Sequence, residues 1–411
     1  MAIAECRACG NRSLLPVLDL GSQALTGIFP HTREEKVPVE PLELVRCSPE
    51  GCGLVQLRHT VDPSLMYGDS YGYRSGIRPF MVNHLRSKVE TVTGLVDLEA
   101  TDLVLDIGSN DSTLLRHYPA DGPTLVGIDP TGEKWRPRYP RHIDLIADFF
   151  SKETFGARYG DRKAKIITSI AMFYDLPDPL AFMRDVHDVL DDDGVWMLEM
   201  SYLPSMLAAT AYDVVCHEHL EYYALRPIEW MAERAGLTVI RADVTDVYGG
   251  SLCLTLAKTP TRHKVDEAAI DQLRRQEEAL GLDSDAPFTS FAARVEEHRA
   301  ELRGFLADSR AAGKLTLGYG ASTKGNVILQ YCGIDESDLP CIGEVSPEKA
   351  GRFTPGTHIP IVSEEAALAQ KPDQLLVLPW VYRDGYIDRE KKFLAAGGKL
   401  AFPLPAPLTL I

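Results

Sequence analysis

The segment DLVLDIGSNDSTLLRHY (residues 102–118) constrains the fold more than any other part of the chain. Its first part is an apolar strand, its middle is a polar turn around Gly108, and its end has the amphipathic pattern of a helix start. A buried strand, a glycine turn and a helix N-terminus in succession form a common cradle for a nucleotide-like ligand. The sequence therefore predicts an open α/β sheet that binds such a ligand at its edge.

Further strands follow this segment. PTLVGIDPT ends near Asp129, which lies 23 residues after Asp106, and HIDLIADFF ends near Asp148 and Phe149. An acidic residue at Asp129 suits the two ribose hydroxyls of an adenosine, while Asp148 and Phe149 suit the adenine amine and ring. Two more strands are expected in AKIITSIAMFYDLPDP and GVWMLEMSY. The predicted cofactor-binding residues are Asp106, Gly108, Asn110, Asp129, Asp148 and Phe149.

The order of elements after the fifth strand distinguishes between versions of this fold. A helix in PIEWMAERAGL precedes a strand in TVIRADVT and an antiparallel partner in GGSLCLTLAK. This ending matches the seven-stranded sheet of class I S-adenosylmethionine (SAM) methyltransferases. A Rossmann-like oxidoreductase is the alternative, but a dinucleotide loop needs three glycines and only Gly108 is present. We therefore expect SAM rather than NAD.

Four of the eight cysteines form two closely spaced pairs near the N-terminus. Cys6 and Cys9 lie in the turn CRACGN, and Cys47 and Cys52 lie in the turn CSPEGCG. In a reducing compartment such spacing favours a tetrahedral thiolate zinc site, with buried or redox-active thiols as the alternative. Four cysteines leave no open coordination position for a substrate. The sequence thus predicts one structural zinc ion.

Composition narrows the classes of partner. A chain of 411 residues is long enough for two to three domains. The formal net charge of −16 disfavours nucleic acid and anionic membranes as partners. No apolar run approaches membrane-spanning length, and MAIAECRACG lacks the features of a signal peptide. We expect a cytoplasmic monomer that acts on a small molecule.

A second α/β unit is predicted beyond residue 260. Two charged helical segments lead to KLTLGYGASTKGNVILQYCG, which repeats the plan of strand, glycine turn and helix, and the strands LPCIGEVSP and QLLVLPW follow. Backbone amides at the start of that helix, together with Lys324, suit a phosphate group. An ordinary turn that binds nothing is the alternative. Lys324 is therefore a candidate substrate-binding residue.

Proton-transfer groups are concentrated in VVCHEHLEYYAL (residues 214–225), just past the fifth strand. His217, Glu218, His219 and Tyr222 all lie in this segment. His217 and His219 are two residues apart, so on a strand they would share one face and offer a pair of metal ligands, although no third ligand is evident nearby. Tyr222, like the upstream Tyr71 and Tyr73, alternatively contributes only ring packing.

Over nearly its whole length the chain resembles the SAM-dependent sugar C-methyltransferases of deoxysugar biosynthesis. The resemblance rests on the two cysteine pairs and on YGDSYGYRSG, VLDIGSND, CHEHLEYYAL, YGGSL, GYGASTKGN and LPWVYRDGYIDRE, in this order. It implies a class I SAM-methyltransferase domain (76–260) between a zinc-binding N-terminal lobe (1–75) and a helical arm with a C-terminal Rossmann-like α/β domain (261–411). The implied substrate is a nucleotide-linked 4-keto-6-deoxy sugar, methylated on a carbon next to the ketone.

The implied reaction explains the concentration of ionisable groups. A hydrogen on carbon is weakly acidic even beside a ketone, so the site needs a base at the carbon and hydrogen-bond donors at the enolate oxygen. By resemblance His219 is the base, Glu218 lies beside it and Tyr73 reaches in from the N-terminal lobe. His217 and Tyr222 are further catalytic candidates. Tyr71, Tyr73 and Lys324 are the expected substrate-binding residues.

Two positions depart from the pattern of some relatives. Cys216 replaces a tyrosine before the His-Glu-His segment, and Tyr174 with Asp175 replaces a histidine after the fourth strand. A different sugar, a different carbon or a hydroxyl acceptor therefore stays open. An O- or N-methyltransferase acting on a nucleotide sugar or a related metabolite is the alternative function.

Overall fold

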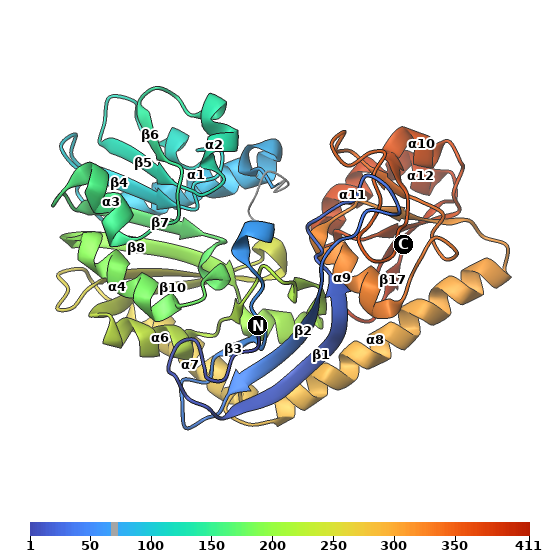
Figure 1. Ribbon diagram of the computed structural model, residues 1–411, viewed down its shortest axis with the longest axis horizontal. Coiled ribbons are helices and arrows are strands. Elements are labelled where there is room, and N and C mark those ends of the chain that lie inside the picture. Colours follow the sequence, from blue (N-terminus) through green and yellow to red (C-terminus); the bar gives the residue numbers. More distant parts are fainter. Residues whose placement is uncertain (67–72) are drawn as a thin grey trace.

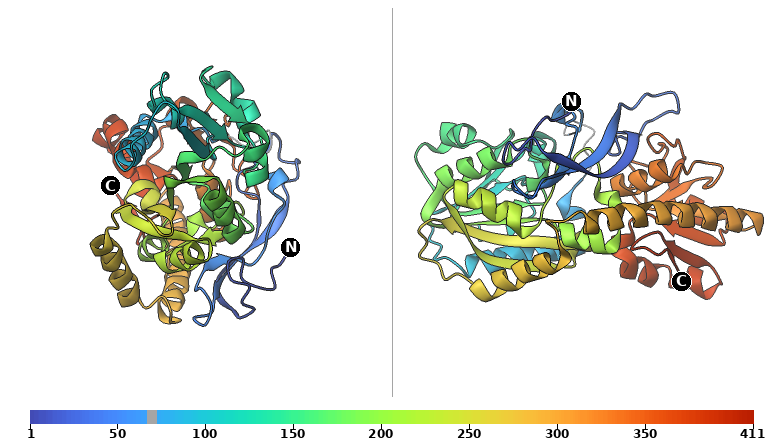
Figure 2. Two further views of the ribbon diagram at one scale, coloured as in Figure 1. Left: turned by 90° about the vertical axis from the view of Figure 1, so that its left-hand side faces the viewer. Right: turned by 90° about the horizontal axis from the view of Figure 1, so that it is seen from below.

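The computed structural model describes residues 1–66 and 73–411 and contains three β-sheets. In Figure 1 the central sheet with its helices lies on the left and the C-terminal unit on the right. The N-terminal strands lie between them, and the long helix α8 (Ala286–Ala311) extends from the middle of the molecule along the C-terminal unit, as the right-hand view of Figure 2 also shows. Within the described residues, no helix combines the length and the apolar character that a membrane span requires.

The central sheet has seven strands in the order β10-β11-β8-β7-β4-β5-β6. Its first five strands along the chain are parallel, and β11 is antiparallel to both of its neighbours. This arrangement confirms the expected class I methyltransferase sheet. The carboxyl ends of β4, β5 and β6 consequently meet at one edge. The strands are β4 (Leu103–Ile107), β5 (Thr124–Ile128), β6 (Ile143–Ile146), β7 (Ala164–Ile170), β8 (Leu190–Ser201), β10 (Leu237–Thr245) and β11 (Ser251–Lys258).

The helix expected directly after the Gly108 turn is replaced by a single short 3-10 turn, η3 (Leu115–His117). Gly108, Asn110 and Ser112 all have positive φ angles, of 75°, 48° and 64°. Left-handed backbone at alternate residues is incompatible with a right-handed helix. The ligand cradle at this edge is therefore a loop rather than a helix N-terminus, and that part of the sequence prediction is wrong.

Amphipathic helices cover the central sheet. In α6 the buried residues Leu225, Ile228, Met231 and Ala232 recur at helical spacing and form one apolar face. In α4 the Asp178 side chain accepts a hydrogen bond from the Ala181 amide and caps the helix start. The helices are α1 (Pro79–Thr93), α2 (Gly132–Trp135), α3 (Lys152–Tyr159), α4 (Pro179–Val189), α5 (Leu203–Ala209), α6 (Leu225–Arg234) and α7 (Glu267–Leu280).

The N-terminal sheet contains four antiparallel strands, and its fourth strand comes from far along the chain. Its members are β1 (Leu14–Ala24), β2 (Val39–Cys47), β3 (Val55–Leu57) and β9 (Glu221–Tyr222), in that order. Gln56 of β3 pairs with Glu221 of β9, and Val55 pairs with Tyr222. The segment with the predicted catalytic residues is thus bound edge to edge to the N-terminal lobe.

The C-terminal unit is the expected smaller Rossmann-like α/β domain. Its six strands follow the order β14-β13-β12-β15-β16-β17, and only β17 is antiparallel to its neighbour. Ser322 caps α9 by accepting a hydrogen bond from the Gly325 amide. The elements are β12 (Thr316–Tyr319), α9 (Thr323–Cys332), β13 (Ile342–Glu344), β14 (Ile361–Ser363), α10 (Glu364–Leu368), β15 (Gln374–Val377), α11 (Arg383–Arg389), α12 (Lys391–Ala395), β16 (Lys399–Phe402) and β17 (Thr409–Leu410).

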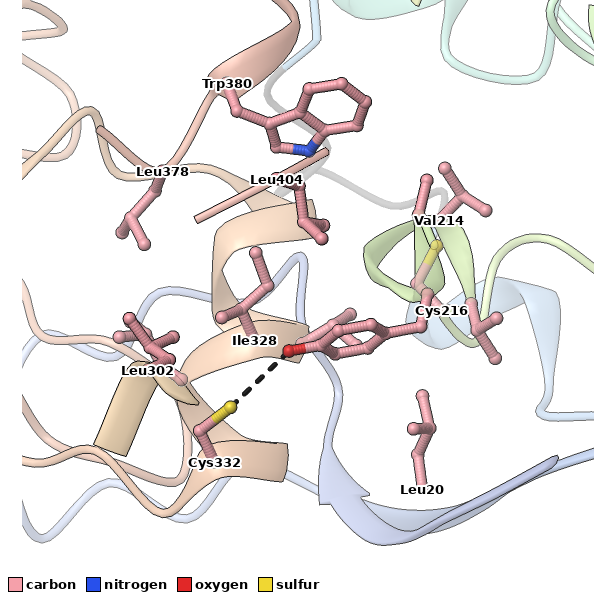
Figure 3. Packing of buried hydrophobic residues seen from close by; sticks show 14 of the residues in the cluster. Leu20, Val214, Cys216, Leu302, Ile328, Cys332, Leu378, Trp380 and Leu404 are labelled. Atoms are coloured by element: carbon pink, nitrogen blue, oxygen red, sulfur yellow. Dashed lines mark hydrogen bonds between the residues drawn. The ribbon is translucent and has the colours of Figure 1, made fainter. Parts of the chain in front are cut away.

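One hydrophobic core joins the N-terminal sheet, the segment around Val214 and the C-terminal unit. Figure 3 shows Val214 and Cys216 in one cluster with Leu20 of β1 and Ile328 of α9. Within this cluster the Tyr212 hydroxyl lies 3.4 Å from the Cys332 sulfur. The backbone that leads to His219 is therefore anchored by three parts of the chain.

Candidate active site

The four N-terminal cysteines converge as predicted. Their Sγ atoms all lie within 4.8 Å of one another, with 3.6 Å between Cys6 and Cys52 and 3.5 Å between Cys9 and Cys47. Four thiolates at about 2.3 Å from a tetrahedral zinc ion would be separated by about 3.8 Å, so the cluster fits zinc. All four thiols are free rather than paired in disulfides. Hydrogen bonds within the cluster lower the pKa of the Cys47 thiol and raise the pKa values of the Cys6 and Cys52 thiols, and metal binding has to displace the protons that these thiols keep.

The zinc cluster is closely packed. The Asn11 amide lies 3.6 Å from Cys47 Sγ, and the Gln56 amide donates to Cys6 Sγ over 3.2 Å. A Cβ atom on Gly51 would collide with the Cys47 sulfur, so only glycine fits there. Four protein ligands with such support leave no position for a substrate, which makes the site structural.

The edge formed by β4 and β5 brings four predicted cofactor residues together. The Asn110 amide donates to Asp129 Oδ2 over 2.7 Å, and the Thr131 amide donates to Asp129 Oδ1 over 2.7 Å. Asp106 is buried, accepts a hydrogen bond from Thr168 Oγ1 over 2.6 Å, and has its pKa raised to about 7 by burial. A Cβ on Gly108 would lie 3.0 Å from Met172 Cγ, so this turn also needs glycine. The edge offers a carboxylate that can accept hydrogen bonds and a turn of backbone amides that can donate them, and this combination fits SAM.

Asp148 and Phe149 lie beyond the end of β6, on the same edge of the sheet. The Asp129 amide donates to the carbonyl of Ile146 over 3.1 Å, which ties the end of β6 to that of β5. Phe149 is 56% exposed, and Asp148 accepts a hydrogen bond from the Phe149 amide over 2.8 Å. An exposed aromatic ring at this position is available to stack on a planar ligand.

His219 is held in one orientation. Its Nδ1 lies 2.8 Å from the carbonyl oxygen of Val214, and its ring contacts Tyr174 edge-on with 4.4 Å between centroids. A carbonyl only accepts, so Nδ1 carries the hydrogen and Nε2 keeps its lone pair. Burial, with a contribution from the charge of Lys324, lowers the pKa of His219 to about 3. The imidazole is therefore neutral at physiological pH.

His217 and His219 do not share a strand face as the sequence suggested, and they bond carbonyls from different parts of the chain. Residues 215–220 do not form a strand, and His217 Nε2 lies 3.0 Å from the carbonyl of Glu40 in β2. Within the described residues, the four cysteines are the one group of three or more His, Cys, Asp or Glu side chains close enough for a metal. The two histidines thus do not form a metal site.

Glu218 and Tyr222 both pack into the protein. A Cβ on Gly27 would come within 2.7 Å of Glu218 Oε1, so the N-terminal lobe closes over this carboxyl group. Burial raises the pKa of Glu218. The hydroxyl of Tyr222 donates to the carbonyl of Val214 over 3.4 Å, so Tyr222 and His219 share one acceptor.

Tyr73 and Lys324, the two predicted substrate residues that the structure describes, meet at Tyr248. The hydroxyls of Tyr73 and Tyr248 are 2.6 Å apart, and Lys324 Nζ lies 5.8 Å from the centre of the Tyr248 ring. The side-chain amide of Asn110 donates to the carbonyl of Tyr73 over 3.2 Å, which joins this cluster to the cofactor edge. Tyr71 falls outside the described residues.

Sequence reasoning missed Tyr248. It lies in η7 (Val247–Gly249) with φ of 55°, a left-handed conformation that is unusual for a tyrosine. Such strain persists where the surroundings fix it, and it concentrates at functional sites. The YGGSL motif contained the signal, because two glycines directly after a tyrosine indicate an unusual turn.

Lys324 also faces a buried carboxyl group. Asp213 Oδ2 accepts a hydrogen bond from Trp380 Nε1 over 2.8 Å at the junction with the C-terminal unit. Burial raises the pKa of Asp213, while the charge of Lys324 and the bond from Trp380 lower it. The charge of Lys324 in the C-terminal unit thus lowers the pKa of both His219 and Asp213.

Comparison with known proteins gives three family models along the chain. A putative zinc-binding domain matches residues 6–67, a methyltransferase domain matches 83–242 and a C-methyltransferase C-terminal domain matches 246–405. The C-methyltransferase NovU of Streptomyces niveus is 32% identical over 410 residues, which cover 98% of this chain and 96% of NovU.

Two solved structures show weaker likeness. One chain comes from the complex between the Haloferax volcanii Trm112 methyltransferase activator and the putative methyltransferase, with 15% identity, a TM-score of 0.36, and coverage of 43% of this chain and 89% of that one. The other is the CcbJ methyltransferase from Streptomyces caelestis, with 13% identity, a TM-score of 0.33, and coverage of 42% and 89%.

Proposed function

The chain belongs to the SAM-dependent C-methyltransferases, and we propose that its acceptor is a carbon next to the ketone of a nucleotide-linked 4-keto-6-deoxy sugar. SAM is the cofactor and zinc the structural metal. The observation that carries the proposal is the orientation of the His219 imidazole, whose Nδ1 bonds the Val214 carbonyl and leaves the lone pair of Nε2 free.

The proposed reaction begins with removal of a proton from carbon. His219 Nε2 takes the proton, and the Nδ1 bond to the Val214 carbonyl keeps the ring aligned while positive charge develops. The electron pair moves into the ketone and places charge on its oxygen. The hydroxyls of Tyr73 and Tyr248 are the proposed hydrogen-bond donors to that oxygen. Glu218 and Tyr222 support the base.

The proposed cofactor residues each contact a different part of SAM. Asp106, Gly108 and Asn110 approach the amino-acid portion, Asp129 accepts the ribose hydroxyls, and the residues after β6 receive the adenine. Bound SAM supplies an electrophilic methyl group. Support for this assignment comes from the loop at Gly108, where no side chain fits, and from the exposed ring of Phe149.

The nucleotide of the substrate is assigned to the C-terminal unit. Lys324 lies in the first turn of α9, where backbone amides and a cation attract phosphate. All the residues assigned to the site come from one chain, so a monomer suffices. The free thiols of the chain suit a reducing cytoplasm.

The test is to incubate zinc-loaded enzyme with SAM and a panel of nucleoside diphosphate 4-keto-6-deoxy sugars, and to examine the products by NMR. We expect a new methyl group bonded to carbon, at a position next to the ketone. A methyl group on oxygen or nitrogen would support the alternative acceptor. Absence of turnover with every 4-keto sugar would refute the substrate class.

A further inference from the structure

The loop of the zinc cluster carries an arginine directed at the catalytic segment. Arg7 lies between Cys6 and Cys9, and its side chain is only 3% exposed. Its Nε atom lies 3.8 Å from Oε1 of Glu221, whose side chain is fully buried. Glu221 follows His219 by two residues. An ion pair therefore connects the zinc loop to the neighbourhood of the proposed base.

Arg7 is fixed by several hydrogen bonds to the N-terminal lobe. Its guanidinium donates to the carbonyl of Leu57 over 2.5 Å and to Thr60 Oγ1 over 2.8 Å. Its backbone amide donates to Gln56 Oε1 over 3.0 Å, and the amide of the same glutamine donates to Cys6 Sγ. A metal ligand, Arg7 and strand β3 thus form one connected unit.

The same strand carries the catalytic segment. Besides the pairing of Gln56 with Glu221, the Leu57 amide donates to the carbonyl of Leu220 over 2.8 Å. The Leu220 amide donates in turn to the carbonyl of Tyr174 over 2.7 Å, and the Tyr174 ring packs on His219. The residues directly after His219 are therefore held by the N-terminal lobe and by Tyr174, which follows β7.

From these contacts we infer that Arg7 is a positioning residue for catalysis, which acts through Glu221 on the placement of His219. The inference rests on the proposed function for the role of His219. Glu221 lies in the short strand β9, two residues after His219, and its fully buried carboxyl oxygens have no hydrogen-bond partner among the described residues. Removing the guanidinium takes away the charged group that faces this carboxyl group, so the position of β9 should shift. Proton abstraction depends on sub-ångström placement, so a shift of about 1 Å lowers the rate by about 10²-fold.

The test compares Arg7→Met, Arg7→Lys and Glu221→Gln in the full-length, zinc-loaded enzyme. We expect Arg7→Met to keep one zinc per chain and parental SAM affinity, while kcat falls between about 10-fold and 10²-fold with little change in KM. Arg7→Lys should restore part of the rate. Because the pair acts as a unit, the Arg7→Met/Glu221→Gln double variant should be less impaired than the product of the single effects.

A second readout does not depend on the substrate. Hydrogen exchange of the backbone amides between residues 215 and 224 should accelerate in Arg7→Met, and exchange in the central sheet should stay slow. The matched control is Arg46→Met, because Arg46 in β2 is a second arginine of the N-terminal lobe with a buried side chain, and its ion pair, with Asp285, leads to α8 instead. That variant should keep the parental kcat.

Distinct outcomes separate this inference from the proposed function. Parental enzyme that does not methylate any 4-keto sugar contradicts the proposed function, and the exchange measurement then still decides the role of Arg7. Arg7→Met with parental kcat and parental exchange overturns the inference. If Arg7→Met fails to fold, Glu221→Gln decides, and a folded Glu221→Gln enzyme with parental kcat and exchange overturns the inference as well.

Discussion

The hydroxyl oxygens of Tyr73 and Tyr248 lie 2.6 Å apart, although Tyr73 precedes α1 and Tyr248 lies in the turn before β11. Tyr248 holds a left-handed backbone conformation, and Tyr73 is still 44% exposed. In this pair one phenol donates its hydrogen to the other, which leaves one hydroxyl hydrogen to donate to a ligand oxygen.

Tyr248→Phe should lower kcat by about 10²-fold, because one donor to the developing oxygen charge is lost. SAM affinity, measured by calorimetry, should stay at the parental value. Tyr159→Phe serves as the control, since its hydroxyl bonds Asp144 on the other side of the sheet. Equal kcat values for Tyr248→Phe and the parent would exclude Tyr248 from catalysis.

His219→Asn should lower kcat by about 10²- to 10⁴-fold and leave SAM affinity near normal, because it removes the proposed general base. It should also abolish any exchange of the substrate's α-hydrogen with deuterium from solvent. His263→Asn is the matched control, since His263 also bonds a backbone carbonyl, that of Asp193. Near-parental methylation by a folded His219→Asn enzyme would place the base elsewhere.

The stability of the protein should depend on pH through His219. Its pKa is about 3 in the folded chain, whereas an imidazole in the unfolded chain titrates near about 6.5. The unfolded state then binds more protons between these values, so the free energy of unfolding falls as pH is lowered through this window. Chemical denaturation at pH 7.5 and pH 5 should show a smaller fall for His219→Asn than for the parent. Identical pH dependence of the two proteins would contradict the neutral, buried imidazole.

Asp129→Ala should weaken SAM binding by about 1–3 kcal/mol, the cost of losing a charged hydrogen-bond acceptor. Isothermal calorimetry measures this directly, and thermal unfolding of the same sample reports any loss of structure in the Gly108 loop. Asp243→Ala, on the edge strand β10, should bind SAM like the parent. Parental affinity in the Asp129 variant would remove this carboxylate from the cofactor site.

Stripping zinc should disorder the N-terminal lobe and reduce turnover, because the metal holds two turns that no disulfide connects. Elemental analysis should find one zinc per chain, and chelation should speed hydrogen exchange in residues 1–60. Readdition of zinc should restore both order and rate. A metal-free preparation with full activity would show that the cysteines act without a metal.

The sequence by itself determined the features that depend on local pattern. Alternating buried strands and amphipathic helices, a lone Gly108 at a strand end and the spacing of Cys6, Cys9, Cys47 and Cys52 each follow from near neighbours in the chain. Backbone periodicity acts over a few residues, and each cysteine pair lies within one turn, which is why the predicted strands and the two cysteine turns match the structure.

Only the tertiary structure decided which side chains meet. The positive φ angles at Asn110 and Ser112 replace an expected helix by a loop, and His217 and His219 bond carbonyls from different parts of the chain. The partners of Tyr248 and Arg7 lie 175 and 214 residues away. In irregular segments the direction of a side chain is set by such long-range packing and hydrogen bonding rather than by local periodicity, so a local pattern cannot specify it.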